Sequence, residues 1–69
     1  MDTIQLTVNG EVKHINAKTS IRSLLEQLDF ADKRVAVEVN GNIVPKSLHT
    51  ETYLKGQDRV EIVVAVGGG

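Results

Sequence analysis

The sequence ends in three consecutive glycines, Gly67, Gly68 and Gly69, which follow its most apolar segment. Glycine has no Cβ atom, so a glycine backbone can enter a channel that is too narrow for other residues. Three extended residues span about 10 Å, enough to reach a buried site in another protein. We therefore expect a domain over residues 1–66 and a flexible tail over 67–69 that presents the α-carboxylate of Gly69. A frayed, inert terminus is the alternative.

The carboxylate at the end of such a tail needs a second enzyme before it can react. A free carboxylate is inert towards nucleophiles at neutral pH, and adenylation with ATP is a way to create a leaving group. The activated carbonyl would then accept sulfide, a thiol or an amine. In this interpretation the protein is a substrate and carrier, not an enzyme, and its partners hold the catalytic residues.

The other chemically active residues do not form a recognisable catalytic or metal-binding pattern. His14 and His49 lie on different segments without further ligands at a typical spacing, and we expect both at the surface. Three serines lack a nearby His–Asp pattern, and the Gly-x-Ser-x-Gly elbow is absent. The chain has no cysteine, which excludes a thiolate zinc site and a cysteine nucleophile. We expect no metal and no cofactor.

Length and charge favour one small domain that acts through protein partners. The chain has 69 residues and a net charge of −1, without a basic patch for nucleic acid. The apolar run 62–66 is too short to span a bilayer, and the acidic, alternating start at residues 1–5 does not resemble a signal peptide. We expect a cytoplasmic protein, monomeric when free, that binds neither nucleic acid nor membrane.

The first elements that must position the tail are a hairpin and a helix. The first strand has an apolar residue at every second position: Ile4, Leu6 and Val8. Asn9-Gly10 predicts a tight turn, and residues 11–17 should return antiparallel with Val12 and Ile15 as apolar contacts. Because Val12 and Ile15 break strict alternation, we expect a bulge or an early end of pairing. A helix capped by Thr19 or Ser20 should follow, with one apolar stripe: Ile21, Leu24, Leu25 and Leu28.

Two further strands and an irregular segment are predicted next. Residues 35–39 alternate as a third strand, and Asn40-Gly41 turns the chain into a short extended piece at residues 43–44. Pairing should stop at Pro45 or lie at a sheet edge there. The segment 46–54 is polar and irregular, with Tyr53 and Leu54 as its expected anchors.

The last predicted strand, residues 59–66, leads directly into the glycines. Its core face comprises four apolar residues: Val60, Ile62, Val64 and Val66. The other face begins charged and becomes apolar at Val63 and Ala65. We predict that Val63, Ala65 and Val66 form a partner-docking surface beside the tail. Shielding of Val63 inside a central strand is the alternative. One helix can cover only one face of the sheet, so the other face is solvated or used for binding.

Three segments together carry a family resemblance: residues 39–45 (VNGNIVP), 58–63 (DRVEIV) and 66–69 (VGGG). Across nearly the whole chain, the sequence resembles the ubiquitin-like sulfur carriers, and among them the ThiS family of thiamine biosynthesis. The resemblance implies a β-grasp fold of the α+β class, with one mixed sheet of four to five strands covered on one face by one helix. One departure is Gly56-Gln57-Asp58, where the family usually places glycine next to aspartate.

The resemblance also implies a role for each tail residue. Gly69 would become an acyl-adenylate and then a thiocarboxylate, and Gly67 and Gly68 would enter the active sites of partners. Those partners would be a ThiF-type adenylyltransferase, an enzyme that donates cysteine-derived sulfur, and a ThiG-type thiazole synthase. The sulfur would pass to the thiazole ring of thiamine.

Three other functions remain open at this point. The small subunit of molybdopterin synthase has the same fold and a Gly-Gly ending, although the short length and the Asn-Gly-x-Ile-Val-Pro segment favour the thiamine carriers. Covalent modification of protein lysines would use the same activation step. An interaction domain with an inert tail is the third.

Overall fold

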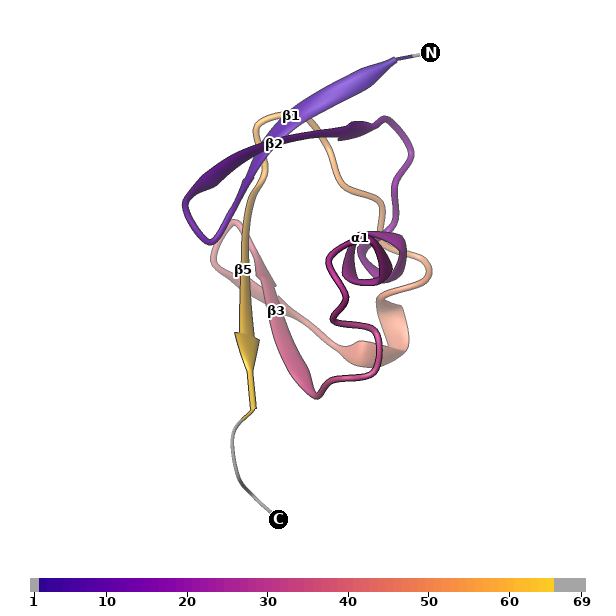
Figure 1. Ribbon diagram of the computed structural model, residues 1–69, viewed down its shortest axis with the longest axis vertical. Helices are drawn as coiled ribbons and strands as arrows, with labels where there is room; N and C mark the ends of the chain where they lie inside the picture. The colour runs from indigo at the N-terminus through magenta and orange to yellow at the C-terminus, as the bar shows by residue number, and fades with distance from the viewer. Residues whose placement is uncertain (1, 66–69) are drawn as a thin grey trace.

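The computed structural model describes residues 2–65, which form a single mixed sheet with one helix packed on one face (Figure 1). The elements are β1 (Thr3–Val8), β2 (Glu11–Asn16), α1 (Ile21–Gln27), β3 (Val35–Val39), β4 (Asn42–Val44), a 3-10 turn η1 (Lys46–Leu48) and β5 (Arg59–Val64). The sheet has five strands in the order β2-β1-β5-β3-β4. β1 and β5 run parallel, and the other neighbours are antiparallel. The predicted α+β, ubiquitin-like β-grasp architecture is confirmed.

The first hairpin forms as predicted, but its second strand has no bulge. Asn9 and Gly10 both have positive φ, 51° and 85°, as a two-residue hairpin turn requires. Pairing is continuous from Thr3 opposite Asn16 to Val8 opposite Glu11. Because side chains alternate between the faces of a strand, this register puts Val12 on the outer face, where it is 57% exposed. The prediction that Val12 contacts the core was wrong.

Helix α1 begins at a serine cap and covers the inner face of the sheet. The Ser23 backbone N–H donates to the Ser20 hydroxyl oxygen at 3.1 Å, so Ser20 is the N-cap. The helix residues Leu24 and Leu25 are buried in the core. After the helix, Asp29 takes a positive φ of 64° and turns the chain towards β3. Within the described chain, no helix is long and apolar enough to cross a membrane.

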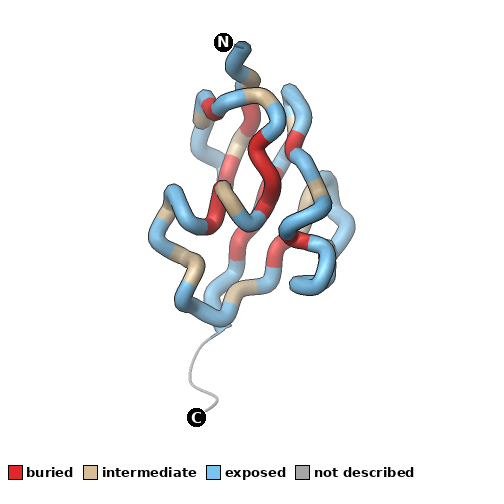
Figure 2. The backbone as a smooth tube through the Cα atoms, turned by 90° about the vertical axis from the view of Figure 1, so that its right-hand side faces the viewer, coloured by how far each residue is buried: buried red, intermediate tan, exposed pale blue. Residues whose placement is uncertain are grey.

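The hydrophobic core lies between α1 and the inner face of the sheet (Figure 2). Its buried members come from the helix, four strands and one loop: Leu6, Val8, Ile15, Ile21, Leu24, Leu25, Val37, Leu54, Val60 and Ile62. β5 contributes Val60 and Ile62 from the centre of the sheet. β5 is therefore paired with β1 on one edge and β3 on the other, and its inner face packs against the core under α1.

The second hairpin ends at the edge of the sheet, as the proline predicts. Asn40 and Gly41 have φ values of 53° and 88° and make the turn between β3 and β4. β4 ends at Val44, directly before Pro45, and occupies the edge position. Proline has no N–H for a sheet ladder, so the position is consistent with its chemistry.

The segment after β4 contains a buried histidine that the sequence did not predict. His49 is only 5% exposed, and its Nε2 atom lies 3.0 Å from the carbonyl oxygen of Val44. The carbonyl of His49 in turn accepts a hydrogen bond of 3.0 Å from the Arg22 N–H at the start of α1. His49 thus links β4 to the helix, and the expectation of a surface position was wrong. His14 is exposed, as predicted.

Only one of the two predicted anchors in this segment is buried. The Leu54 side chain is 4% exposed, whereas that of Tyr53 is 56% exposed. The backbone explains the difference, because Tyr53 forms a single antiparallel bridge with Ser20 at the helix start. Neighbouring positions of an extended segment point to opposite sides, so only Leu54 reaches the core.

Candidate functional site

β5 is the element that leads to the predicted tail. It lies between β1 and β3 in the sheet. Val64 is its last residue, and Ala65, which follows, is the last residue that the structure describes. The predicted tail, Gly67–Gly69, and Val66 of the predicted docking surface lie outside the described residues. β5 ends at Val64, so the predicted strand over residues 59–66 was too long at Ala65.

A side chain from the first hairpin fixes the middle of β5. Asn9 Nδ2 donates to the carbonyl oxygen of Ile62 at 3.2 Å, and the Ile62 N–H donates to Asn9 Oδ1 at 2.7 Å. The β1 backbone is in register with β5 at Thr7 and Val8, and the last backbone bond is the one that the Asn9 N–H donates to the carbonyl oxygen of Val60 at 2.8 Å. A side-chain amide offers the same donor and acceptor as a peptide group. Asn9 therefore continues the β1–β5 ladder by one step.

The turn of the second hairpin fixes the start of β5 in a similar way. Asn40 Oδ1 accepts from the Arg59 N–H at 2.9 Å, and Asn40 Nδ2 donates to Asp58 Oδ1 at 2.9 Å. The Asn40 N–H donates to the Arg59 carbonyl at 2.8 Å. Both Asn-Gly turns thus hold the strand that leads to the tail, a role that turn chemistry alone did not predict.

The outer face of β5 is open at the C-terminal end of the strand. Val63 is 59% exposed and lies directly opposite Ala36 of β3. Ala65 is also exposed, and its N–H donates to the carbonyl oxygen of Arg34 at 2.8 Å. Val64, on the core side of the strand, is 38% exposed because the core does not extend this far. The alternative, that neighbours inside a central strand shield Val63, is therefore not observed.

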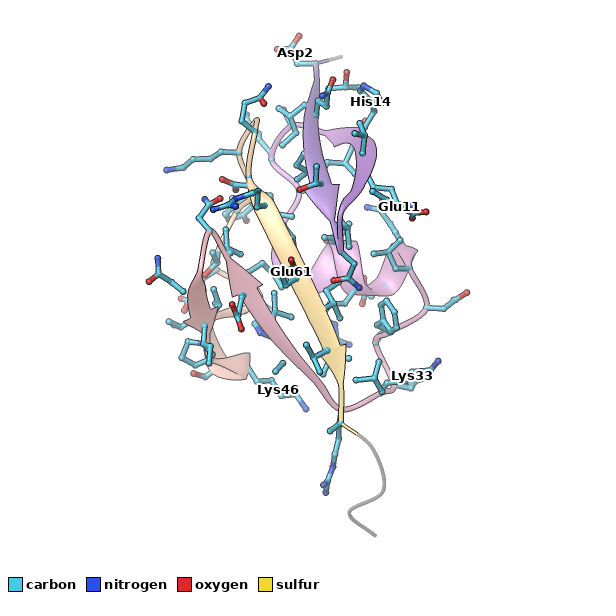
Figure 3. All side chains as sticks on the ribbon, turned by 90° about the vertical axis from the view of Figure 1, so that its left-hand side faces the viewer. Asp2, Glu11, His14, Lys33, Lys46 and Glu61 are labelled. Atoms are coloured by element: carbon cyan, nitrogen blue, oxygen red, sulfur yellow. The ribbon has the colours of Figure 1, made fainter. Side chains whose placement is uncertain are left out.

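Two further apolar residues on this face of the sheet were not predicted as part of a surface. Ala36 is exposed on β3, and Ile43 of edge strand β4 is 69% exposed opposite Glu38. Glu38 also lies directly opposite Glu61, which faces the viewer on β5 in Figure 3. The alternation of residues 35–39 places Ala36 on the outer face, but the pairing partner of β3 cannot be read from sequence. The outer face thus combines apolar side chains with a pair of carboxylates.

The exposed apolar residues near the end of β5 have the character of a binding surface. Residues 2–65 contain no group of three or more His, Asp or Glu side chains arranged to hold a metal ion. An apolar patch beside a chain terminus can exclude water from a contact with another protein.

Comparison with known proteins assigns the family. The family model for the ThiS family matches residues 6–69 of this chain. The chain belongs to the ThiS family.

Individual members and relatives support the ThiS assignment. The crystal structure of the thiamine biosynthesis protein ThiS from Geobacter metallireducens has a TM-score of 0.81 and 32% sequence identity, covering 96% of this chain and all of the other. The uncharacterised protein ycf40 of Porphyra purpurea is 41% identical over 96% of this chain and 93% of its own length. A thiazole synthase of Paramagnetospirillum magneticum is 38% identical over 96% of this chain, which spans 20% of that protein.

The one noted departure from the ThiS pattern has a local structural consequence. Gln57 has a positive φ of 71°, a conformation that glycine adopts without strain and other residues rarely take. The Gln57 N–H donates to the carbonyl oxygen of Gln5 at 2.7 Å, which holds the turn against β1. Here the chain has glutamine in a backbone conformation that favours glycine.

Proposed function

We propose that this protein is the sulfur carrier of thiamine biosynthesis and is itself not an enzyme. Membership of the ThiS family carries the proposal, together with the match of that family model through residue 69. The solved relative named as a thiamine biosynthesis protein supports the same pathway over molybdopterin synthesis. The compact β-grasp domain serves to hold and present a reactive terminus.

The proposed chemistry takes place at the carboxyl group of Gly69. The carboxylate attacks the α-phosphate of ATP in a ThiF-type adenylyltransferase and releases pyrophosphate. Sulfide, which a donor enzyme derives from cysteine, then attacks the carbonyl carbon and displaces AMP. The product is a thiocarboxylate. Gly67 and Gly68 allow the tail to enter each active site because they carry no side chains.

The acceptor of the sulfur in this proposal is a ThiG-type thiazole synthase. Two thiazole synthases contain a segment that is 38% and 35% identical to this chain and makes up 20% of each protein. Because these segments are part of the same polypeptide as a thiazole synthase, they support a functional interaction between the carrier and a thiazole synthase. We propose that the carrier docks through Val63, Ala65 and Val66, of which Val63 and Ala65 are exposed.

Deletion of Gly69 tests the activation step. With the cognate adenylyltransferase, the full chain should support ATP–pyrophosphate exchange, and the chain that ends at Gly68 should not. Thermal unfolding should be unchanged, because the core lies within residues 6–62. Exchange that persists without Gly69 would contradict the proposed site of adenylation.

A further inference from the structure

A basic pocket lies on the helix side of the molecule, beside the end of β5. The pocket has a volume of about 320 Å³ and lies between α1, the loop that leads into β3, and the segment after β4. Four of its lining residues are apolar and buried or half-buried, and we call them the floor: Leu25, Phe30, Ala31 and Val35. His49 and Thr50 also line the pocket. This volume is near the lower end of pockets that hold ligands, about 300–1,000 Å³, and it would accept an apolar side chain of another protein.

The rim of this pocket concentrates positive charge. It carries four of the eight Lys and Arg residues of the chain, Arg22, Lys33, Arg34 and Lys46, and no Asp or Glu. The net charge of the whole chain is −1, so this charge is a local feature. In Figure 3, Lys33 and Lys46 lie on either side of the end of β5.

Three of these four cations have no ionic partner among residues 2–65. Arg22 is paired with Glu26, its Nε atom lying 3.2 Å from Oε2. Lys33, Arg34 and Lys46 form no salt bridge to a described residue. Lys33 Nζ lies 5.6 Å from the centre of the Phe30 ring, which orients this ammonium group over the apolar floor.

Hydrogen bonds build the pocket walls and join them to the end of β5. The Phe30 N–H donates to the Leu25 carbonyl at 2.8 Å, and the Lys33 N–H donates to the Phe30 carbonyl at 3.0 Å. Arg34 accepts the 2.8 Å bond from the Ala65 N–H through its carbonyl oxygen. A protein that receives the chain beyond Ala65 would therefore also lie close to the basic pocket.

We propose that the basic pocket is a second docking site, which binds an acidic segment of the thiazole synthase with an apolar side chain inserted over Leu25 and Phe30. The proposal rests on the proposed function, because it takes the synthase as the protein that receives the tail. Cations that have no ionic partner among residues 2–65 and surround an apolar floor are complementary to carboxylates that flank an apolar residue. The pocket lies on the helix side of the molecule, whereas the Val63 surface lies on the outer face of the sheet. The synthase would therefore contact both sides of the sheet at the end of β5.

A pair of charge-reversed variants tests this pocket. Lys33→Glu/Lys46→Glu reverses two exposed cations of the rim, and Lys18→Glu/Lys55→Glu reverses two exposed lysines outside the pocket with the same change in net charge. Binding to purified thiazole synthase is measured by calorimetry at low and high salt, and the fold is checked by thermal unfolding. We expect the rim variant to bind on the order of tenfold more weakly or worse, with a smaller salt dependence, and the control to bind like the wild type.

The outcomes separate this proposal from the proposed function. Equal weakening of both variants would mean that only net charge matters, and unchanged binding of the rim variant would mean that the synthase does not use the pocket; either result overturns the proposal. Shifts of pocket signals in NMR spectra with pyrophosphate, combined with unchanged synthase binding, would assign the pocket to a free anion and overturn it too. A sulfur-loaded wild type that binds the synthase would leave the carrier function intact in all three cases.

Discussion

At the scale of single residues, the side chain of Asn9 connects the first turn of the chain to the strand that bears the tail. It supplies both a donor and an acceptor to Ile62, beyond the last backbone bond between β1 and β5. The sequence predicted the turn from Asn9-Gly10 and its tolerance of positive φ. The partner of the side chain, 53 positions away, depends on the tertiary arrangement and has no local signal.

Replacing Asn9 with glycine isolates this contribution. Glycine keeps the positive φ of the turn but removes both side-chain hydrogen bonds, which contribute about 1 kcal/mol each. We expect the free energy of unfolding to fall by roughly 1–2 kcal/mol, with faster hydrogen exchange at the Ile62 amide. Urea unfolding and NMR exchange measure the two effects. An Ile62 amide that exchanges as slowly as in the wild type would contradict the assigned role.

Gln57 offers the opposite case, a residue whose replacement should stabilise the fold. Its φ of 71° strains an L residue, and glycine relieves that strain at some cost in unfolded-chain entropy. We expect Gln57→Gly to raise the free energy of unfolding by about 0.5–1 kcal/mol. Lys55→Gly is the control, since Lys55 is not among the residues with positive φ and should lose stability. A loss of stability at both positions would argue against strain at Gln57.

At the scale of elements, β5 combines a buried inner face with an open outer face. Val60 and Ile62 are 1% and 6% exposed, whereas Val63 is 59% exposed. Alternation along the strand predicted which residues share a face. It did not predict where the core ends, because that depends on the length of α1 and on the loop that follows it. Val64 therefore lies on the core side and is still 38% exposed.

The docking role of Val63 can be separated from its part in the fold. Val63→Asp should weaken binding to the adenylyltransferase and the thiazole synthase by at least about tenfold, because it places a charge in a desolvated contact. Stability should change by no more than about 1 kcal/mol, the range of strand propensities. Calorimetry and thermal unfolding measure both.

Val12→Asp is the matched control for this experiment. Val12 is 57% exposed on the same face of the sheet, but it lies on edge strand β2, away from the end of β5. We expect the Val12 variant to bind both partners normally. Equal losses of binding for the two variants, or a collapse of melting temperature for Val63→Asp alone, would remove the basis for a docking surface at Val63.

At the scale of the whole molecule, local patterns predicted the fold well and the side-chain environments less well. The helix, both Asn-Gly turns and most strands follow from alternation, capping and turn chemistry, whereas β2 pairs continuously although Val12 and Ile15 break the alternation. His49 was expected at the surface and is buried, whereas Tyr53 was expected as an anchor and is exposed. Burial in the segment after β4 depends on which side of the backbone faces the helix. The pocket rim combines residues 22, 33, 34 and 46, and only the tertiary structure brings them together.

The molecule as a whole is organised around one strand. Both Asn-Gly turns bind β5, the core packs against it, and an apolar surface and a basic pocket flank its end. This organisation supports the proposed role, in which the domain presents the residues after β5 to other proteins.

The most direct test of the carrier function is the intact mass of the protein purified from cells that contain the sulfur-relay enzymes. We predict a species in which one oxygen of the Gly69 carboxyl group is replaced by sulfur, located by fragmentation to the C-terminal peptide. The species should disappear when Gly69 is deleted or when further residues follow it, and should revert to the carboxylate when thiazole synthase and its substrates are added. A mass that is unchanged under all of these conditions would contradict the account.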